Sequence, residues 1–175
     1  MDEALEEELE IMEDRAKPRA ALSVESFELE IAEVCGRPAE AVEITATVGH
    51  AVERMQKESI GSVVIVEGGR TVGILTERDL LTKVIGRGEG WSERPVAEIM
   101  TAAPETLQRH DAIKYLLHRM HVGGFRHVPI VDDEGRPLHV VGIRDVLAYV
   151  LEHFDQEIAT TPSDPFRGKR ERYGP

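Results

Sequence analysis

The chain has 175 residues, of which 41% are hydrophobic and 31% charged, and its formal net charge is −12 at pH 7. This composition is typical of a globular protein, and the excess of negative charge argues against nucleic acid or an anionic membrane surface as the main partner. Cys35 is the single cysteine, so an internal disulfide is excluded. There is no signal-like N-terminal segment and no apolar run long enough to cross a membrane. We therefore expect a cytoplasmic protein.

The two ends of the chain differ in composition from the middle. Between positions 2 and 14 there are eight acidic residues and no basic one, and Leu5, Leu9 and Met12 form a thin apolar stripe at helical spacing. We expect residues 1–26 to form an acidic helical arm, either a surface or dimer-docking helix or a partly disordered segment. Residues 155–175 lack any periodicity and are expected to form a disordered tail.

The middle of the chain contains an internal repeat. The segment 61–81 recurs as 126–147, and the aspartates Asp79 and Asp145 at its end are 66 residues apart. A unit of about 60 residues buries too little apolar surface alone and normally pairs with its copy. We predict two repeats, at 27–88 and 89–154, packed about a pseudo-two-fold axis with two equivalent clefts between them.

Both repeats show the same order of predicted elements. The first has a short lead-in helix, a helix, two strands and a closing helix, at 27–36, 49–58, 63–66, 71–75 and 77–85. The second has the matching segments at 95–101, 110–120, 128–131, 138–141 and 144–154. Each unit therefore has the order strand, helix, strand, strand, helix, which gives an α+β fold of two βαββα repeats.

These residues resemble a known family. The segment Gly-Ile-Leu-Thr-Glu-Arg-Asp at 73–79 resembles the signature of the cystathionine-β-synthase (CBS) domain. The segment Arg-His-Val-Pro-Ile-Val-Asp at 126–132, and Ile-Met-Thr at 99–101 with Pro104, resemble its approach segments. The resemblance covers about residues 28–154. It implies that the repeats pack sheet to sheet as a Bateman module, a pair that binds AMP, ADP, ATP or S-adenosylmethionine in its clefts.

Thr76 and Asp79 stand where a predicted strand passes into a predicted helix. A helix N-terminus offers free N–H groups to a phosphate or a ribose edge, and a carboxylate accepts hydrogen bonds from both ribose hydroxyls. The same pair of residues also forms an ordinary capping box, which contributes about 1 kcal/mol with no ligand. The repeated context favours a ligand site. The resemblance assigns Asp79 to the ribose and Thr76 to sugar or phosphate.

The resemblance further implies that the repeat opposite the ribose supplies cations to the phosphates. For the Thr76/Asp79 site these are Arg126, His127 and Arg144, and for the Asp145 site the equivalents are Gly61, Ser62 and Arg78, with only one charge. Adenine would lie near Ile74, Thr106 and Leu107. Gly142 stands where the first repeat has Thr76, so the second site lacks a hydroxyl. We expect two unequal sites, of which the Thr76/Asp79 site is the tighter.

Other chemistry is less well supported by the sequence. His118 and His121 lie one helical turn apart, but a zinc site needs three or four convergent ligands. No catalytic motif is recognisable. We therefore expect a stand-alone regulatory, energy-sensing module and not an enzyme, forming a homodimer through its helices and signalling by a change of shape or partner affinity. The alternatives are a ligand-free structural module, a metal-binding CBS protein, or an enzyme such as a slow nucleotide hydrolase.

Overall fold

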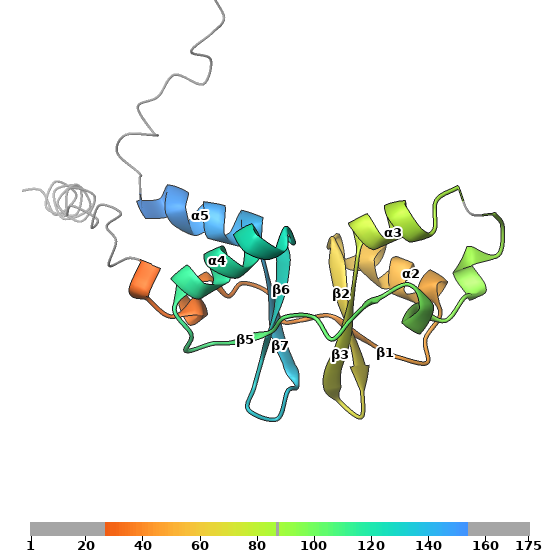
Figure 1. The fold of residues 1–175 in the computed structure, drawn as a ribbon, viewed down its shortest axis with the longest axis horizontal. Coiled ribbons are helices and arrows are strands. Elements are labelled where there is room, and N and C mark those ends of the chain that lie inside the picture. The colour runs from red at the N-terminus through yellow and green to blue at the C-terminus, as the bar shows by residue number, and fades with distance from the viewer. Residues whose placement is uncertain (1–26, 87, 154–175) are drawn as a thin grey trace, which may run out of the picture.

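The computed structural model describes residues 27–86 and 88–153 (Figure 1). The predicted arm at 1–26 and the predicted tail at 155–175 lie outside the described residues. Within the described part, none of the helices has the length and apolar character that a membrane span requires.

The first half of the structure is built on a four-stranded sheet. Its elements are β1 (Ala41–Glu43), α2 (Val48–Glu58), β2 (Ser62–Glu67), β3 (Arg70–Thr76) and α3 (Glu77–Lys83). The strand order is β1-β2-β3-β4, and β4 (Thr101–Ala102) comes from the segment that leads into the second half. β1 runs parallel to β2, and the other pairs are antiparallel.

The second half repeats this arrangement. Its elements are β5 (Leu107–Gln108), α4 (Ile113–Gly123), β6 (His127–Val131), β7 (Pro137–Gly142) and α5 (Ile143–His153). β5 pairs parallel with β6, and β6 pairs antiparallel with β7. The predicted α+β fold of two βαββα repeats is therefore confirmed.

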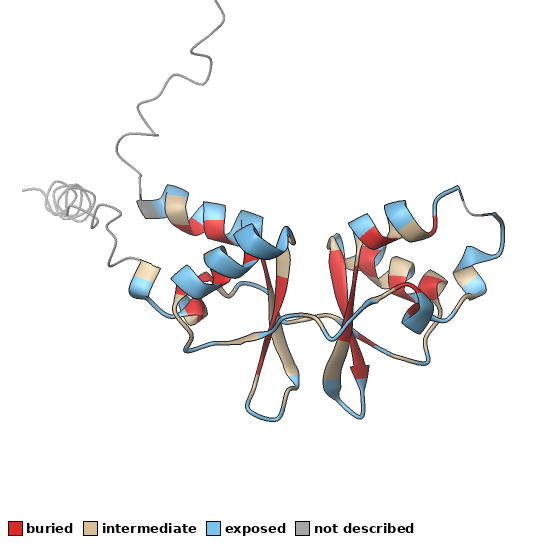
Figure 2. Ribbon diagram, in the orientation of Figure 1, coloured by how far each residue is buried: buried red, intermediate tan, exposed pale blue. Residues whose placement is uncertain are grey.

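The two sheets lie side by side at the centre of the molecule, with the helices on the outer sides (Figure 1). Each half has its own core of aliphatic side chains, and buried positions concentrate on the strands and on the helix faces that cover them (Figure 2). Alternate residues of β2 point to the face of the sheet that is opposite the helices. Val64 and its partner Ile74 on β3 are buried but belong to neither core. Their burial fits a sheet-to-sheet contact between the halves.

The chain crosses between the halves twice. Ile31 and Val34, in the 3₁₀ turn η2 (Ile31–Val34), are buried in the core of the second half, which follows much later in the sequence. Conversely, Val96 and Ile99, near the short turn η4 (Val96–Glu98), are buried in the core of the first half. Each half is therefore completed by the segment that precedes the other half in the chain.

The crossing explains why residues 27–36 do not form the predicted helix. The N–H groups of Ile31 and Ala32 donate to the carbonyls of Asp111 and Arg109 in the second half, at 2.8 and 2.9 Å. A longer helix would use these donors internally. As it leaves each core, the chain runs along the edge of the sheet in that same half: Ala39 N donates to Leu138 O in the second half, and Ala103 N donates to Val72 O in the first. These two edge segments border the spaces between the halves.

We predict that Ile31→Ala lowers the free energy of unfolding by about 2–5 kcal/mol, because it leaves a cavity in the core of the second half. Urea denaturation followed by circular dichroism measures the change. Leu29→Ala is the matched control, since Leu29 belongs to the same segment but is 45% exposed, and its effect should stay within about 0.5 kcal/mol. Equal effects of the two substitutions would contradict the crossed packing.

Candidate functional site

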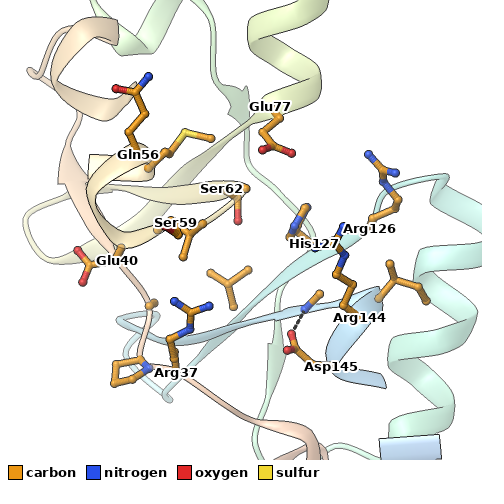
Figure 3. Close-up of a pocket in the computed structure, with 18 of the residues that line it drawn as sticks. Arg37, Glu40, Gln56, Ser59, Ser62, Glu77, Arg126, His127, Arg144 and Asp145 are labelled. Carbon is orange, nitrogen blue, oxygen red and sulfur yellow. Dashed lines mark hydrogen bonds between the residues drawn. The ribbon is translucent and has the colours of Figure 1, made fainter. Parts of the chain in front are cut away.

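Two cavities lie between the halves, and each contains the aspartate that follows the second long strand of one repeat. The Asp79 cavity has a volume of about 390 Å³. The Asp145 cavity has a volume of about 740 Å³ (Figure 3). Both fall within the range of small-molecule sites, which is about 300–1,000 Å³.

Residues from both halves line the Asp79 cavity, together with residues within 101–105 of the second crossing segment, which leads from the core of the first half to β5. The lining consists of Ile74, Thr76, Glu77, Arg78, Asp79, Thr101, Ala103, Pro104, Glu105, Gly123, Gly124, Phe125, Arg126 and His127. Apolar groups form part of the wall, and the polar groups come mainly from the starts of α3 and β6. An enclosure with apolar walls and a few converging polar groups is typical of a ligand pocket.

The Asp79 carboxylate is buried, with 7% exposure, and both of its oxygens are hydrogen-bonded. Oδ2 accepts from Thr76 N at 3.0 Å and from Thr76 Oγ1 at 2.6 Å. Oδ1 accepts from Thr101 Oγ1 at 3.1 Å and forms an ion pair with Lys83 Nζ at 2.7 Å. Asp79 N in turn donates to Thr76 Oγ1, which completes a capping box at the start of α3. The carboxylate is thus held rigidly at the cavity wall.

The environment of Asp79 keeps this carboxyl group ionised. Burial by itself raises its pKa, but hydrogen bonds from Lys83 and Thr76, with the positive charge of Lys83, outweigh that effect and hold the pKa below its ordinary value. Lys83 Nζ also donates to Ile99 O at 2.7 Å, so the same ammonium group ties α3 to the second crossing segment.

Basic groups from both halves converge on the Asp79 cavity. Arg78 Nη1 donates to Gly124 O at 2.8 Å and so joins α3 to the end of α4. Arg126 and His127 stand at the start of β6. Among the described residues, the Arg126 guanidinium forms no hydrogen bond or ion pair, so its charge is available to a ligand. Burial and the neighbouring Arg126 charge lower the pKa of His127, which favours the neutral imidazole.

The Asp145 cavity is the larger of the two, and more charged side chains line it than were expected from the sequence. Asp145 is exposed, and its Oδ2 accepts a 2.7 Å hydrogen bond from Gly142 N. This bond corresponds to the one from Thr76 N to Asp79, but Gly142 provides no hydroxyl. Figure 3 shows polar side chains around this space, among them Arg37, Glu40, Ser59, Ser62, Glu77, Arg126, His127 and Arg144. Three arginines therefore line a cavity for which only one positive charge was expected.

The structure distributes the predicted site residues over both cavities. Ile74, Thr76, Arg78, Asp79, Arg126 and His127 line the Asp79 cavity, whereas Arg126, His127, Arg144 and Asp145 line the Asp145 cavity. Thr106 is exposed and lies outside both linings. Ala103 and Pro104, slightly earlier in the same segment, line the Asp79 cavity instead.

The positions of Arg78 and Arg144 correct the expectation from the sequence. Arg144 lines the Asp145 cavity and not the Asp79 cavity, and Arg78 lines the Asp79 cavity. The reason is local. Each arginine directly precedes an aspartate in the first turn of a helix, so both side chains of the pair reach the same opening.

Some residues of the site could not be identified from the sequence alone. Lys83 had a signal, because it lies four residues after Asp79 on one helix, where an ion pair is expected. Thr101 was noted only as part of the Ile-Met-Thr motif, and Arg37 had no signal, since only the crossed path of the chain brings these two residues to the cavities. Among the described residues, no group of three histidine, cysteine or acidic side chains comes together in a way that could hold a metal ion.

Comparison with known proteins identifies the family. The model of the CBS domain matches residues 31–86 and again 96–152. The chain therefore belongs to the CBS domain family and carries a tandem pair of these repeats.

Two curated relatives illustrate the similarity. An uncharacterised protein from Methanopyrus kandleri is 33% identical over 122 residues, covering 65% of this chain and 60% of that protein. The mitochondrial CBS domain-containing protein CBSX3 of Arabidopsis thaliana is 32% identical over 117 residues, covering 64% of this chain and 56% of that protein. The chain thus spans 60% or less of the length of these relatives.

Solved structures resemble this fold as well. A CBS-domain containing protein from Agrobacterium tumefaciens is 32% identical with a TM-score of 0.59, covering 65% of this chain and 90% of that one. A CBS domain protein from Pyrobaculum aerophilum, solved in complex with AMP, is 26% identical with a TM-score of 0.64, covering 73% of this chain and 99% of that one.

We predict that Asp79→Ala lowers the free energy of unfolding at neutral pH by about 1–3 kcal/mol, because it removes the carboxylate part of the capping box and the buried ion pair with Lys83. Asp145→Ala is the matched control. It removes a single bond from an exposed carboxylate and should cost less than about 1 kcal/mol. Urea denaturation of the two variants provides the comparison.

This difference should depend on pH. Because folding lowers the pKa of Asp79, its contribution is present above the pKa of the unfolded chain and is lost as the pH falls through the pKa of the folded state. The stabilities of the native protein and Asp79→Ala should therefore converge in acid. A constant gap down to low pH would show that Asp79 does not stabilise the fold as a carboxylate.

Proposed function

We propose that this CBS pair binds an adenosine-containing ligand, such as AMP, ADP or ATP, in the Asp79 cavity and regulates a partner protein in response. The observation that supports the proposal is the convergence of groups from both halves on one cavity. Thr76 and Asp79 come from one repeat, and Arg126 and His127 come from the other. The AMP complex of the Pyrobaculum relative supports the same ligand class.

The chemistry of the cavity suits the three parts of such a ligand. The Asp79 carboxylate accepts from the ribose hydroxyls, and Ile74, Ala103 and Pro104 offer apolar contact to the adenine ring. The phosphate lies toward Arg126 and His127 at the start of β6. S-adenosylmethionine shares the adenosine part and is a further candidate of the same class.

Ribose binding requires an exchange of hydrogen bonds, and the surroundings permit it. A ribose diol competes with Thr101 Oγ1 and Lys83 Nζ for Asp79 Oδ1. Lys83 Nζ still donates to the carbonyls of Ile99 and Met100 after release, so its charge is not left without partners. Replacing the Lys83 bond at Asp79 by a ribose bond therefore leaves no charged group without a hydrogen-bond partner.

The same exchange gives the ligand a route to conformational change. Asp79 on α3, Lys83 and Thr101 together hold α3 against β4 and the second crossing segment. A ligand that replaces these bonds alters how firmly that segment is held. Coupling between a ligand site and a partner surface is typically worth about 1–3 kcal/mol, and it is reciprocal.

The Asp145 cavity is a second candidate site for the same ligand class. Its larger volume and its three arginines favour a ligand with more phosphate groups. Among the described residues, the Arg144 side chain has no ion-pair partner, and Asp145 Oδ1 accepts no hydrogen bond, so it is available to a sugar. We keep the tighter AMP site at Asp79, because only that cavity combines a preformed carboxylate with the Thr76 hydroxyl.

The helices suggest how two copies of the chain associate. Ile143, Leu147 and Leu151 are exposed and follow one another at intervals of four residues on α5, and Leu81 is exposed on α3. α3 and α5 lie along the same side of the molecule, at the top of Figure 1. Apolar stripes of this kind mark interaction sites, and we propose that they form a homodimer contact.

We predict that Asp79→Ala weakens AMP binding at least about tenfold, the loss expected for one charge-assisted hydrogen bond. Isothermal titration calorimetry measures the affinity, below the unfolding temperature of the variant. Asp145→Ala should keep the native AMP affinity within about threefold, well under the change expected for one such bond, because it lies in the other cavity.

Several results would contradict this proposal. If Asp145→Ala loses AMP binding and Asp79→Ala keeps the native affinity, the assignment of the two cavities is reversed. A native protein whose unfolding temperature is unchanged by millimolar AMP, ADP and ATP would favour the ligand-free structural module, since saturation at 100 times the dissociation constant adds about 2.7 kcal/mol. Release of product from ATP and magnesium would instead favour the enzyme.

We also predict that Leu147→Lys converts a dimer to a monomer, because it places a charge in the centre of the apolar stripe on α5. Size-exclusion chromatography with light scattering gives the mass. Val122→Lys, at an exposed position near the end of α4, is the control and should leave the mass unchanged. A dimer that persists in Leu147→Lys would place the contact elsewhere.

A further inference from the structure

His127 belongs to the wall that the two cavities share. It is one of three residues that line both spaces, together with Glu77 and Arg126. The strand register explains its position. His127 on β6 faces Gly142 on β7, just as Ser62 on β2 faces Thr76 on β3, so the first repeat has a small serine at the equivalent place.

The neighbouring glycine lets the imidazole reach the first half. Gly61 stands where the second repeat has Arg126, and a Cβ atom at Gly61 would lie 3.5 Å from His127 Nε2. A Cβ atom at Gly142 would lie 3.5 Å from His127 Cδ2. The ring therefore fits between the two halves, against a residue of each that has no side chain. Among the described residues, no other imidazole lines either cavity.

Charged groups of both signs face His127 from every side. Arg126 directly precedes it, just before β6, while Glu77 and Arg78 face it from α3 and Asp145 faces it from α5. Figure 3 shows the ring between Glu77 and Asp145, with Arg144 nearby. Burial, with the charge of Arg126 next in importance, outweighs the acidic groups and holds the pKa of His127 below its ordinary value. The imidazole of the empty protein is therefore neutral at neutral pH.

An anion bound in either cavity changes this balance. A phosphate beside Arg126 offsets the charge that opposes protonation, and it adds a negative potential to those of Glu77 and Asp145. Since the histidine faces both spaces, the effect does not depend on which cavity the anion occupies.

We propose that His127 takes up a proton when an anionic ligand binds in either cavity, so that acidification selectively strengthens the binding of charged adenosine ligands over neutral adenosine. This selectivity rests on the proposed function, because it concerns the same ligand class in the same cavities. His127 thereby acts as a specificity-determining residue for the charge of the ligand.

The sign of the pH dependence follows from linkage. The pKa of His127 is low in the empty protein and higher in the complex with an anion. Between these two values, affinity for the anion rises as the pH falls, by at most about tenfold per pH unit for one proton. Outside that interval the affinity is constant. Neutral adenosine raises no pKa in this way, so its affinity should not increase on acidification.

The experiment compares two probes by calorimetry from about pH 8 to about pH 5.5, the range in which histidine titrates. The charged probe is the methyl ester of AMP, a phosphodiester whose charge does not titrate in this range. The neutral probe is adenosine. His127→Gln removes the titrating group but keeps a polar side chain. His118→Gln, at an exposed position on α4 outside both cavities, is the matched control.

In the native protein and in His118→Gln, affinity for the ester should rise on acidification by at least about threefold, which is a fraction of one linked proton. Affinity for adenosine should not rise. In His127→Gln, affinity for the ester should no longer change with pH, and adenosine binding reports that this variant is folded. Native protein that binds neither probe overturns the proposed function. Binding of the ester with no pH dependence, or with the same dependence in His127→Gln, overturns the role of His127 alone.

Discussion

The structure depends on the exchange of short apolar segments between two halves that are too small to be stable alone. Ile31 and Val34 complete the core of the second half, and Val96 and Ile99 complete the core of the first. Neither repeat can therefore separate from the other without exposing its own core. The exchange also brings the crossing segments to the edges of the sheets, where they close the sides of both cavities. Fold stability and the existence of the sites share this one cause.

A duplicated sequence would give two equal sites, and the differences between the copies make them unequal. Thr76 in the first repeat corresponds to Gly142 in the second, so the hydroxyl that bonds to Asp79 has no equivalent beside Asp145. Gly61 and Ser62 correspond to Arg126 and His127, which places basic groups on the shared wall from one side only. Arg126 and His127 therefore line both cavities, so a ligand in one cavity changes the charge that the other cavity presents.

Asp79 shows that a capping motif and a ligand site can be the same residues. Its carboxylate closes the capping box of α3, and it also binds Lys83 and Thr101 at the wall of a cavity. The two roles are compatible because each carboxylate oxygen accepts more than one hydrogen bond. Because the same carboxylate stabilises the fold and accepts the ligand, ligand binding changes its hydrogen bonds with Lys83 and Thr101. That property is what a regulatory module requires.

The sequence by itself determined the repeat, the order of the main strands and helices, and the place of Thr76 and Asp79 at the start of α3. Periodicity, capping residues and local motifs act over a few neighbouring positions, so they can be recognised without the fold. Only the tertiary structure decided which half each lead-in segment completes, which cavity Arg144 joins and how many arginines line the Asp145 cavity. Those outcomes depend on contacts between residues far apart in the chain. Arg37 carries no local signal for them, and the Ile-Met-Thr motif does not tell which cavity Thr101 joins, since both positions follow from the path of the chain between the two cores.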